Sequence, residues 1–226
     1  MLRIGHRGAC GYAPENTLAS FKKALELSLD YIEFDVYVLK DGSVVVIHDD
    51  KVDRTTNGTG YVLDKTLEEI QNLDAGDGEK IPTLQEVLNL IDKKTKVNIE
   101  LKGEGTAKPV ANIIEDYVQT KGWAYGDFLV SSFNQVELCT FKDLKPEVKI
   151  GALITEIPLD LAKFGEDLKA YSVNPSMEFV NKEFVEDAHK RGLKVFVFTV
   201  NEKDDIQRMK ELNVDGVFSD FPDRVI

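Results

Sequence analysis

The chain has 226 residues, of which 42% are hydrophobic and 30% are charged. This balance is typical of a soluble globular protein and excludes an intrinsically disordered chain. The 28 basic and 40 acidic residues leave a formal net charge of −12. Because nucleic acids and anionic membranes bind basic surfaces, we expect neither as a partner. No apolar run approaches the length of a membrane span, so we also expect no stable membrane insertion.

The cysteine content indicates a reducing compartment. Cys10 and Cys139 lie far apart and form neither a Cys-x-x-Cys pair nor a disulfide framework. Two reduced thiols are typical of a cytoplasmic protein. The first predicted strand begins at Leu2 and leaves no room for a signal peptide, so we expect a cytoplasmic location. The sequence does not indicate an oligomeric state.

Short apolar, β-branched runs alternate with amphipathic segments along the chain. The apolar runs predict strands at residues 2–6, 31–38, 97–101, 128–132, 149–154, 170–173, 195–200 and 216–219. The amphipathic segments predict helices at residues 16–28, 84–93, 107–119, 134–143, 182–191 and 204–212, with a short helical piece at 67–73. We expect Asn16 to begin the first helix, and Thr83 with Glu86 to form a capping box.

This alternation implies parallel strands joined by crossover helices. The tight-turn signal Asp41-Gly42 predicts residues 43–48 as an antiparallel return arm, which places Asp35 opposite His48. Without that arm, eight parallel strands remain, and they predict a (β/α)8 TIM barrel. The alternative, an open doubly wound sheet, needs a glycine-rich phosphate loop, and neither a G-x-G-x-x-G nor a Walker sequence occurs.

Residues 49–80 interrupt the alternation of strands and helices. This stretch is rich in turn residues and contains only the short helical piece. We interpret it as an insertion that folds over one face of the barrel, either as a cap or as an ordinary surface excursion. We therefore expect residues 1–226 to form a single catalytic TIM-barrel domain, with 49–80 as its cap.

Three acidic side chains occupy strand positions that should face the inside of the barrel. Glu33 and Asp35 share one face of their strand, and Glu100 and Lys102 share one face of the next. Charges buried there need pairing or a metal ion. Carboxylates without a cysteine partner suit a hard divalent cation, Mg²⁺ or Ca²⁺. The alternative is a buried salt-bridge network around Lys102.

Two of the three histidines fall near the same place. His6 ends the first predicted strand and His48 ends the return arm, so both should converge on the carboxylates at the barrel mouth. Histidine suits proton transfer near neutral pH, and a pair suggests one acid and one base. The alternatives are a zinc ligand or a structural hydrogen-bond donor. His189, near a predicted helix end, is assigned no chemistry.

Arg7 and Lys102 supply local positive charge in an otherwise acidic chain. A planar guanidinium fits phosphate oxygens in a bidentate manner. An oxygen-liganded metal, an arginine, a lysine and two histidines together suit the cleavage of a phosphoester bond. The residues indicate this type of reaction but not the substrate.

The sequence also resembles the glycerophosphodiester phosphodiesterase family through nearly its whole length. The matching motifs, in family order, are Gly5-His6-Arg7-Gly8, Pro14-Glu15-Asn16-Thr17, Glu33-Phe34-Asp35-Val36, His48-Asp49, Asp53-Arg54-Thr55-Thr56-Asn57-Gly58, Ile81-Pro82-Thr83-Leu84, Asn98-Ile99-Glu100-Leu101-Lys102, Ser131-Ser132-Phe133, Asp215-Gly216 and Ser219-Asp220-Phe221-Pro222. The resemblance implies a barrel hydrolase that converts glycerophosphodiesters to glycerol 3-phosphate and an alcohol.

The resemblance implies roles for individual residues as well. The catalytic pair would be His6 and His48, with one divalent cation, Mg²⁺ or Ca²⁺, held by Glu33, Asp35 and Glu100, and the phosphate contacted by Arg7 and Lys102. Glu15 and Asn16 would support the mouth. Many relatives carry Trp-Thr-Val-Asn at the substrate end, and here Phe198 replaces the tryptophan. Similar enzymes place their cap in the segment after His48.

The expected mechanism leaves several points open. We assign His6 as base and His48 as acid, roles that exchange if the reaction passes through a cyclic phosphate. The first nucleophile is water or the glycerol 2-hydroxyl. The alternatives are a phospholipase D-like activity on lysophospholipids, a Schiff-base aldolase built on Lys102, and a non-catalytic phosphate-binding barrel.

Overall fold

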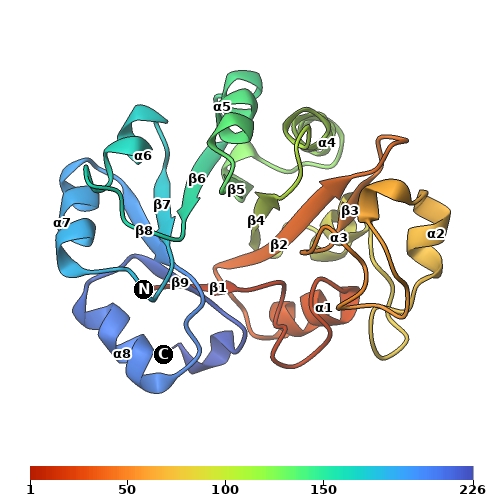
Figure 1. Ribbon diagram of the computed structural model, residues 1–226, viewed down its shortest axis with the longest axis horizontal. Coiled ribbons are helices and arrows are strands. Elements are labelled where there is room, and N and C mark those ends of the chain that lie inside the picture. The colour runs from red at the N-terminus through yellow and green to blue at the C-terminus, as the bar shows by residue number, and fades with distance from the viewer. Residues whose placement is uncertain (226) are drawn as a thin grey trace.

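Eight parallel strands close into a ring in the computed structural model, which describes residues 1–225 (Figure 1). These strands are β1 (Leu2–Gly5), β2 (Tyr31–Val38), β4 (Lys96–Leu101), β5 (Phe128–Ser132), β6 (Lys149–Ile154), β7 (Ser172–Pro175), β8 (Lys194–Val197) and β9 (Gly216–Ser219). Strand β1 closes the ring by pairing in parallel with both β2 and β9. The predicted TIM barrel is confirmed.

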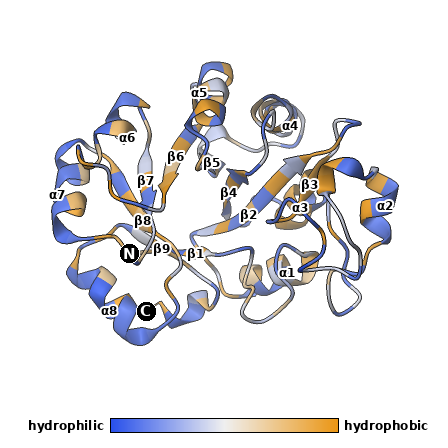
Figure 2. Cartoon of the chain, in the orientation of Figure 1, coloured by the Kyte–Doolittle hydropathy of each residue, from blue (hydrophilic) through white to orange (hydrophobic). Residues whose placement is uncertain are grey.

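Helices connect the strands and surround the ring (Figure 1). They are α1 (Leu18–Glu26), α3 (Leu84–Ile91), α4 (Ala107–Thr120), α5 (Gln135–Leu144), α6 (Lys163–Asp167), α7 (Lys182–Lys190) and α8 (Lys203–Glu211), with short 3-10 turns at η2 (Tyr125–Asp127) and η3 (Pro222–Arg224). Figure 2 shows α8 as mostly hydrophilic, whereas β6 is mostly hydrophobic. The five-residue α6 is absent from the sequence prediction, because so short a segment has little periodicity.

Two strands differ from the prediction by two residues or more at one end or both, whereas β1 and β4 differ by a single residue. Strand β7 lies two residues later than predicted, at Ser172–Pro175, and β8 ends at Val197 instead of residue 200. Proline lacks a backbone N–H and usually indicates the end of a strand. Here Pro175 still belongs to the sheet because its carbonyl oxygen accepts the backbone N–H of Phe198 at 3.2 Å.

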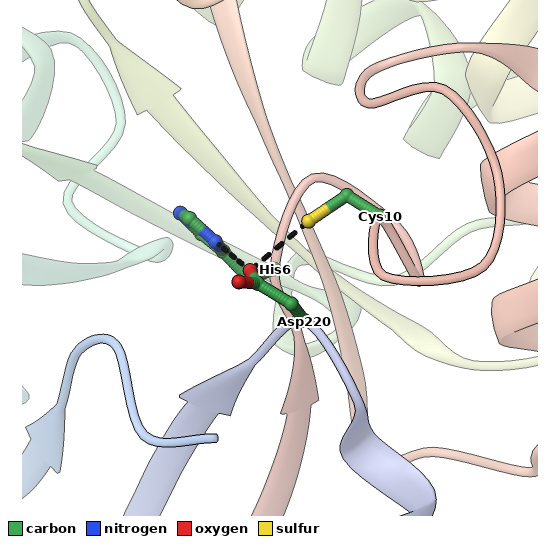
Figure 3. Close-up of side chains that lie close together, drawn as sticks. All are labelled: His6, Cys10 and Asp220. Atoms are coloured by element: carbon green, nitrogen blue, oxygen red, sulfur yellow. Dashed lines mark hydrogen bonds and ion pairs between the residues drawn. The ribbon is translucent and has the colours of Figure 1, made fainter. Parts of the chain in front are cut away.

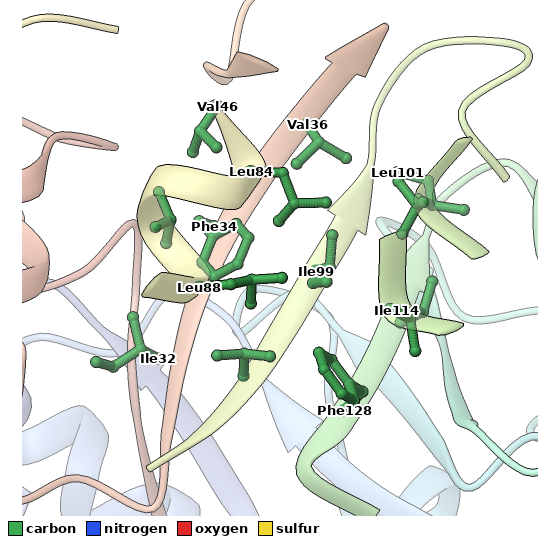
Figure 4. Packing of buried hydrophobic residues seen from close by; sticks show 14 of the residues in the cluster. Ile32, Phe34, Val36, Val46, Leu84, Leu88, Ile99, Leu101, Ile114 and Phe128 are labelled. Atoms are coloured by element: carbon green, nitrogen blue, oxygen red, sulfur yellow. The ribbon is translucent and has the colours of Figure 1, made fainter. Parts of the chain in front are cut away.

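Apolar side chains pack between the strands and the outer helices (Figure 4). Phe34 of β2 and Ile99 of β4 belong to one buried cluster with Leu88 of α3. Side chains alternate across a strand, so Glu33 and Asp35, which flank Phe34, face the inside of the barrel. The predicted faces of β2 and β4 are therefore confirmed. The capping box of Thr83 and Glu86 is also present at the start of α3.

A second buried cluster fills the inside of the ring below the mouth. Its members are contributed by five different strands and are Ile4, Tyr31, Leu129, Phe196 and Phe218. Tyr31 and Leu129 precede the polar residues Glu33 and Ser131 by two positions on the same strand, so they point the same way one layer lower. Inside the barrel, a layer of apolar side chains therefore lies directly below the polar residues of the mouth.

The hairpin after β2 has a different register from the predicted one. Strand β3 (Val44–Val46) pairs antiparallel to β2 outside the ring, as predicted. The loop contains three residues rather than two, because Leu39 N–H donates to the carbonyl of Ser43 at 2.8 Å. Gly42 provides the left-handed conformation of this loop, with φ of 87°. The pairing shifts by one residue, and the prediction that Asp35 lies opposite His48 is wrong.

The segment between β3 and α3 has a small core of its own. It contains the 3-10 turn η1 (Val62–Asp64) and helix α2 (Leu67–Asn72), which lie to one side of the ring in Figure 1. The buried side chains of this core include Val52, Val62 and Ile70, which pack against residues of β2 and β3. Residues 49–80 therefore extend from the hairpin. None of the helices in residues 1–225 combines the length and the apolar character needed to cross a bilayer.

We expect Leu88→Ala to destabilise the fold by about 2–5 kcal/mol, because the lost side chain leaves a cavity between α3 and the strands. Urea unfolding should show the difference as a lower transition midpoint. The control is Val136→Ala, since 73% of Val136 is exposed, and it should change the free energy of unfolding by less than about 0.5 kcal/mol. Equal effects of the two substitutions would contradict the packing described here.

Candidate active site

A pocket of about 130 Å³, partly open to solvent, lies at the end of the barrel where the strands have their carboxyl termini. It is lined by His6, Arg7, Glu33, His48, Asn98, Glu100, Lys102, Phe133, Leu153, Phe198, Thr199 and Phe218. Seven of the residues predicted for the site therefore meet in one cavity. The other three, Glu15, Asn16 and Asp35, contact members of this set.

The three predicted metal ligands lie together. Asp35 of β2 pairs in register with Glu100 of β4, and Glu33 stands two residues before Asp35. One oxygen atom from each of the three carboxylates lies within 4.8 Å of the others, and all three side chains are buried. Burial, together with the charges of Asp35 and Glu100, raises the pKa of Glu33. Such a cluster is stable only with compensating positive charge.

Two cationic side chains offset part of this negative charge. Lys102 Nζ donates to Glu100 at 2.9 Å and lies 3.9 Å from Asp35. The Arg7 side chain lies 3.6 Å from Asp35, and its backbone N–H donates to Glu33 at 2.8 Å. Arg7 has φ of 49°, a left-handed conformation that aims this N–H at the carboxylate. Two cations against three carboxylates leave an excess negative charge.

Glu33 provides the direct test of whether a metal ion fits here. Its Oε2 accepts from Arg7, whereas its buried Oε1 accepts no hydrogen bond from any residue in the range 1–225. A buried carboxylate oxygen without a partner is costly. The buried all-oxygen donor set and this unpaired atom fit a hard divalent cation.

The Nδ1 side of the His6 ring contacts a residue near the other end of the chain. Its Nδ1 lies 2.6 Å from Asp220 Oδ1, in the loop after β9. Asn201 donates to the second oxygen of Asp220 at 2.7 Å, and Cys10 Sγ donates to Oδ1 at 3.0 Å (Figure 3). Although burial opposes ionisation, the hydrogen bonds and the charge of His6 hold the pKa of Asp220 below its usual range. With Nδ1 engaged, His6 has Nε2 for chemistry in the pocket.

His48 has a similar partner but a different environment. Its Nδ1 lies 2.5 Å from Asp49 Oδ1, and its Nε2 lies 3.2 Å from Lys102 Nζ. Burial lowers the pKa of His48, and the charges of Arg7 and Lys102 lower it further against the opposing charge of Asp35. An ammonium group can only donate, so Nε2 of His48 acts as the acceptor in this contact.

A chain of ion pairs links His48 to Arg7 around the rim. Arg54, from the segment 49–80, donates to Asp49 at 2.6 Å and to Glu15 at 2.7 and 2.8 Å. Glu15 also accepts from Arg7 at 2.8 Å. The predicted supporting role of Glu15 therefore has a definite geometry, in which it bridges two arginines.

Asn16 lies beside the carboxylate cluster and does not start the first helix. Helix α1 begins at Leu18 and its N-cap is Thr17, so the expectation that Asn16 starts the helix is wrong. Asn16 has φ of 57°, and its side-chain amide donates to Asp35 at 2.9 Å. Asparagine tolerates this left-handed conformation better than most residues. The hydrogen bond from Asn16 to Asp35 thus stabilises this conformation of the loop before α1.

Several site residues carried no predicted role. Asp49 orients His48 and is held by Arg54. Asp220 orients His6 and is held by Asn201. Phe133 packs edge-on against Phe198, with ring centroids 5.7 Å apart. Asp49 could have been found because it follows His48 directly. Asp220 could have been found because it follows the last strand, which neighbours the first in a closed barrel.

The fold and this mouth define a class: TIM-barrel proteins with a polar site in which buried carboxylates lie beside an arginine and a lysine. The sequence model described as the Glycerophosphoryl diester phosphodiesterase family matches residues 6–224, and the chain belongs to this family. It is 42% identical to a glycerophosphodiester phosphodiesterase of Caldanaerobacter subterraneus, with 100% of this chain and 96% of the relative covered. A glycerophosphodiester phosphodiesterase of Bacillus subtilis is 34% identical, with 99% and 84% covered.

Solved structures agree with this assignment. A phosphodiesterase of Oleispira antarctica, solved in complex with its product sn-glycerol-3-phosphate, superposes with a TM-score of 0.90 at 33% identity. The match covers 98% of this chain and 94% of that one. A glycerophosphodiester phosphodiesterase of Thermotoga maritima gives a TM-score of 0.81 at 28% identity, with 99% and 96% covered.

The carboxylate cluster predicts an unusual pH dependence of stability when metal ions are removed. Burial and the charge of Asp35 raise the pKa of Glu100 from 4.5 to about 7. The folded state then binds more protons than the unfolded state, so the free energy of unfolding should fall as pH rises from about 4.5 to about 7. Urea unfolding in a chelating buffer should show this fall, and Glu100→Gln should reduce it.

The matched control for this experiment is Glu104→Gln, which removes an exposed carboxylate from the loop after β4. It should leave the fall in place. A wild-type slope that Glu100→Gln does not change would contradict the raised pKa of Glu100.

Proposed function

We propose that this chain hydrolyses glycerophosphodiesters to glycerol 3-phosphate and an alcohol, with a divalent cation and a pair of histidines. The observation that carries the proposal is the convergence of His6, His48 and the carboxylate cluster on one pocket. The activity named for the relatives supports the substrate class. The cytoplasm suits the free thiols of Cys10 and Cys139 and is the proposed location.

The proposed cofactor is one hard divalent cation, Mg²⁺ or Ca²⁺, held by Glu33, Asp35 and Glu100. Its support is the buried oxygen donor set and the unpaired Oε1 of Glu33. When bound, such an ion polarises phosphoryl oxygens and offsets charge that develops on them. Arg7 and Lys102 line the same pocket and add positive potential for the phosphodiester.

The surroundings of the two histidines favour His48 as the base and His6 as the acid, the reverse of the assignment made from the sequence. Lys102 donates toward Nε2 of His48, which supports an unprotonated Nε2 in the resting protein. Ionised Asp220 accepts a hydrogen bond from Nδ1 of His6 at 2.6 Å, which leaves Nε2 to donate to the alcohol oxygen. His48 then removes a proton from the nucleophile as its oxygen bonds to phosphorus. His6 protonates the alcohol oxygen as its bond to phosphorus breaks.

Residues 49–80 are the proposed cap of this single-domain enzyme. Arg54 reaches from this segment to Glu15, which supports a position over the rim of the mouth. Phe133, Leu153 and Phe198 give the pocket an apolar lining. This lining favours lysophospholipids as a second substrate class, with the same bond cleaved.

An aldolase is less well supported by the site. Burial lowers the pKa of Lys102, but the charges of Glu100 and Asp35 outweigh burial and raise it. A nucleophilic amine needs the opposite shift, because only the uncharged amine attacks a carbonyl group. The retention of both histidines in the pocket likewise argues against a barrel that only binds phosphate.

We expect release of glycerol 3-phosphate from glycerophosphocholine to require a divalent cation. His6→Ala and His48→Ala should each lower kcat by about 100-fold or more, because each removes a proton-transfer group. The measurement is enzyme-coupled detection of glycerol 3-phosphate, with lysophospholipids as a second substrate panel.

His189→Ala is the matched control for these two substitutions. His189 also contacts an aspartate, with Nε2 2.8 Å from Asp215, but it does not line the pocket. It should retain near-wild-type activity. Full activity of either pocket variant, or of the wild type in a chelating buffer, would overturn the mechanism.

A further inference from the structure

A second group of possible metal ligands includes His6 itself and lies on the Nδ1 side of its ring. Cys10 Sγ, His6 Nδ1 and Asp220 Oδ1 lie within 4.8 Å of one another, and all three residues are partly exposed (Figure 3). His6 and Cys10 come from the loop after β1, and Asp220 comes from the loop after β9. They offer one sulfur, one nitrogen and one oxygen, in contrast to the all-oxygen cluster of Glu33, Asp35 and Glu100.

The two loops that carry these side chains are fixed to each other. The backbone N–H of Gly11 donates to the carbonyl of Asp220 at 3.0 Å. Tyr12 packs edge-on against Phe221, with ring centroids 5.3 Å apart, and its hydroxyl donates to Asp223 at 2.7 Å. Cys10 is therefore held against Asp220 before any ligand binds, which lowers the entropic cost of binding.

We propose that Cys10, His6 and Asp220 form an inhibitory site for Zn²⁺, separate from the proposed magnesium or calcium site. Zinc favours mixed sulfur, nitrogen and oxygen ligands, and three protein ligands leave a position for water. Magnesium and calcium favour oxygen ligands alone. The two sites are thus expected to select different ions.

The present distances are those of a hydrogen-bonded cluster, and a modest adjustment converts it to a metal site. Zinc ligands lie about 2.0–2.3 Å from the ion, so in a tetrahedral site they stand roughly 3.3–3.6 Å apart. The present separations are 2.6 Å from His6 to Asp220 and 3.0 Å from Cys10 to Asp220. Side-chain movements on the order of 1 Å suffice, which is small for partly exposed loop residues.

The proton balance of binding is defined by the same hydrogen bonds. Burial and the hydrogen bond to Asp220 raise the pKa of Cys10, so the metal-free thiol keeps its proton. The ion replaces that proton on sulfur. A neutral His6 moves its Nδ1 proton to Nε2 through solvent, so one proton leaves the protein for each ion bound. The doubly protonated ring that the proposed acid role requires loses its Nδ1 proton as well, so two protons leave. The thiolate and the carboxylate together balance the charge of the ion.

Occupancy of this site would block catalysis, a consequence that rests on the proposed function of His6. With the ion on Nδ1, Nε2 carries a proton on a neutral ring. That nitrogen can then neither accept a proton nor release one readily, so the histidine serves neither as base nor as acid. Inhibition should follow whichever of these two roles His6 has.

The test begins with binding, which does not depend on activity. Isothermal titration with Zn²⁺, in a buffer with Mg²⁺ in large excess, should show one site in the wild-type protein. Cys10→Ser keeps a hydrogen-bond donor to Asp220 but loses the sulfur, and it should weaken binding by about 10-fold or more. Cys139→Ser removes the other, exposed thiol and should bind like the wild type. Co²⁺ should give a thiolate charge-transfer absorption that Cys10→Ser lacks.

Activity provides the second part of the test. With glycerophosphocholine and saturating Mg²⁺, Zn²⁺ should inhibit the wild type and Cys139→Ser, each relative to its own rate without zinc. Cys10→Ser should require about 10-fold more Zn²⁺ for half-inhibition. Cys10→Ala, with folding checked by circular dichroism, serves as a second variant without a ligand or a donor at this position.

The outcomes separate this proposal from the proposed function. Equal zinc affinity in Cys10→Ser and the wild type, or a Co²⁺ complex without thiolate absorption, would overturn the zinc site. Inhibition of all variants at the same concentration would likewise overturn it, because zinc would then be acting at the carboxylates. Zinc binding that depends on Cys10, in a protein without phosphodiesterase activity, would support the site and contradict the proposed function.

Discussion

The mutual repulsion of three buried carboxylates is the constraint on which the barrel mouth depends. Glu33, Asp35 and Glu100 come from neighbouring strands in register, so the pairing of β2 with β4 itself brings their oxygens together. Burial makes each negative charge costly unless a partner offsets it. Lys102 extends from the end of β4, and Arg7 takes a left-handed backbone conformation to direct its N–H at the cluster. The remaining excess of negative charge is the reason that a divalent cation fits.

The same charges organise the rim of the mouth. Arg7 is shared between the carboxylate cluster and Glu15, and Glu15 is shared in turn with Arg54. Arg54 is half exposed, so any single pair that it makes contributes little to stability. Arg54 matters because its guanidinium contacts both Glu15 and Asp49, and Asp49 orients His48. The position of the segment 49–80 and the orientation of a proposed catalytic group are therefore linked through one side chain.

Sequence periodicity predicted the parts of the site that depend on strand faces. The alternation around Phe34 was enough to place Glu33 and Asp35 inside the barrel, because a strand has only two faces. The hairpin register was not predictable, since Asp-Gly occurs in both two-residue and three-residue loops. The start of α1 was equally ambiguous: Asn16 and Thr17 are both good capping residues, and only the hydrogen bond from Asn16 to Asp35 decides between them.

The two histidines differ in how much of the fold must form before each is in place. Asp49 follows His48 directly, so their hydrogen bond needs only local structure. Asp220 lies 214 residues after His6, and the two meet only because β1 pairs with β9. The backbone N–H of His6 donates to the carbonyl of Ser219 at 3.0 Å, and this bond belongs to the junction that closes the ring. A barrel that fails to close therefore loses the orientation of His6 while the contact of His48 with Asp49 can persist, so the step that completes the fold also completes the site.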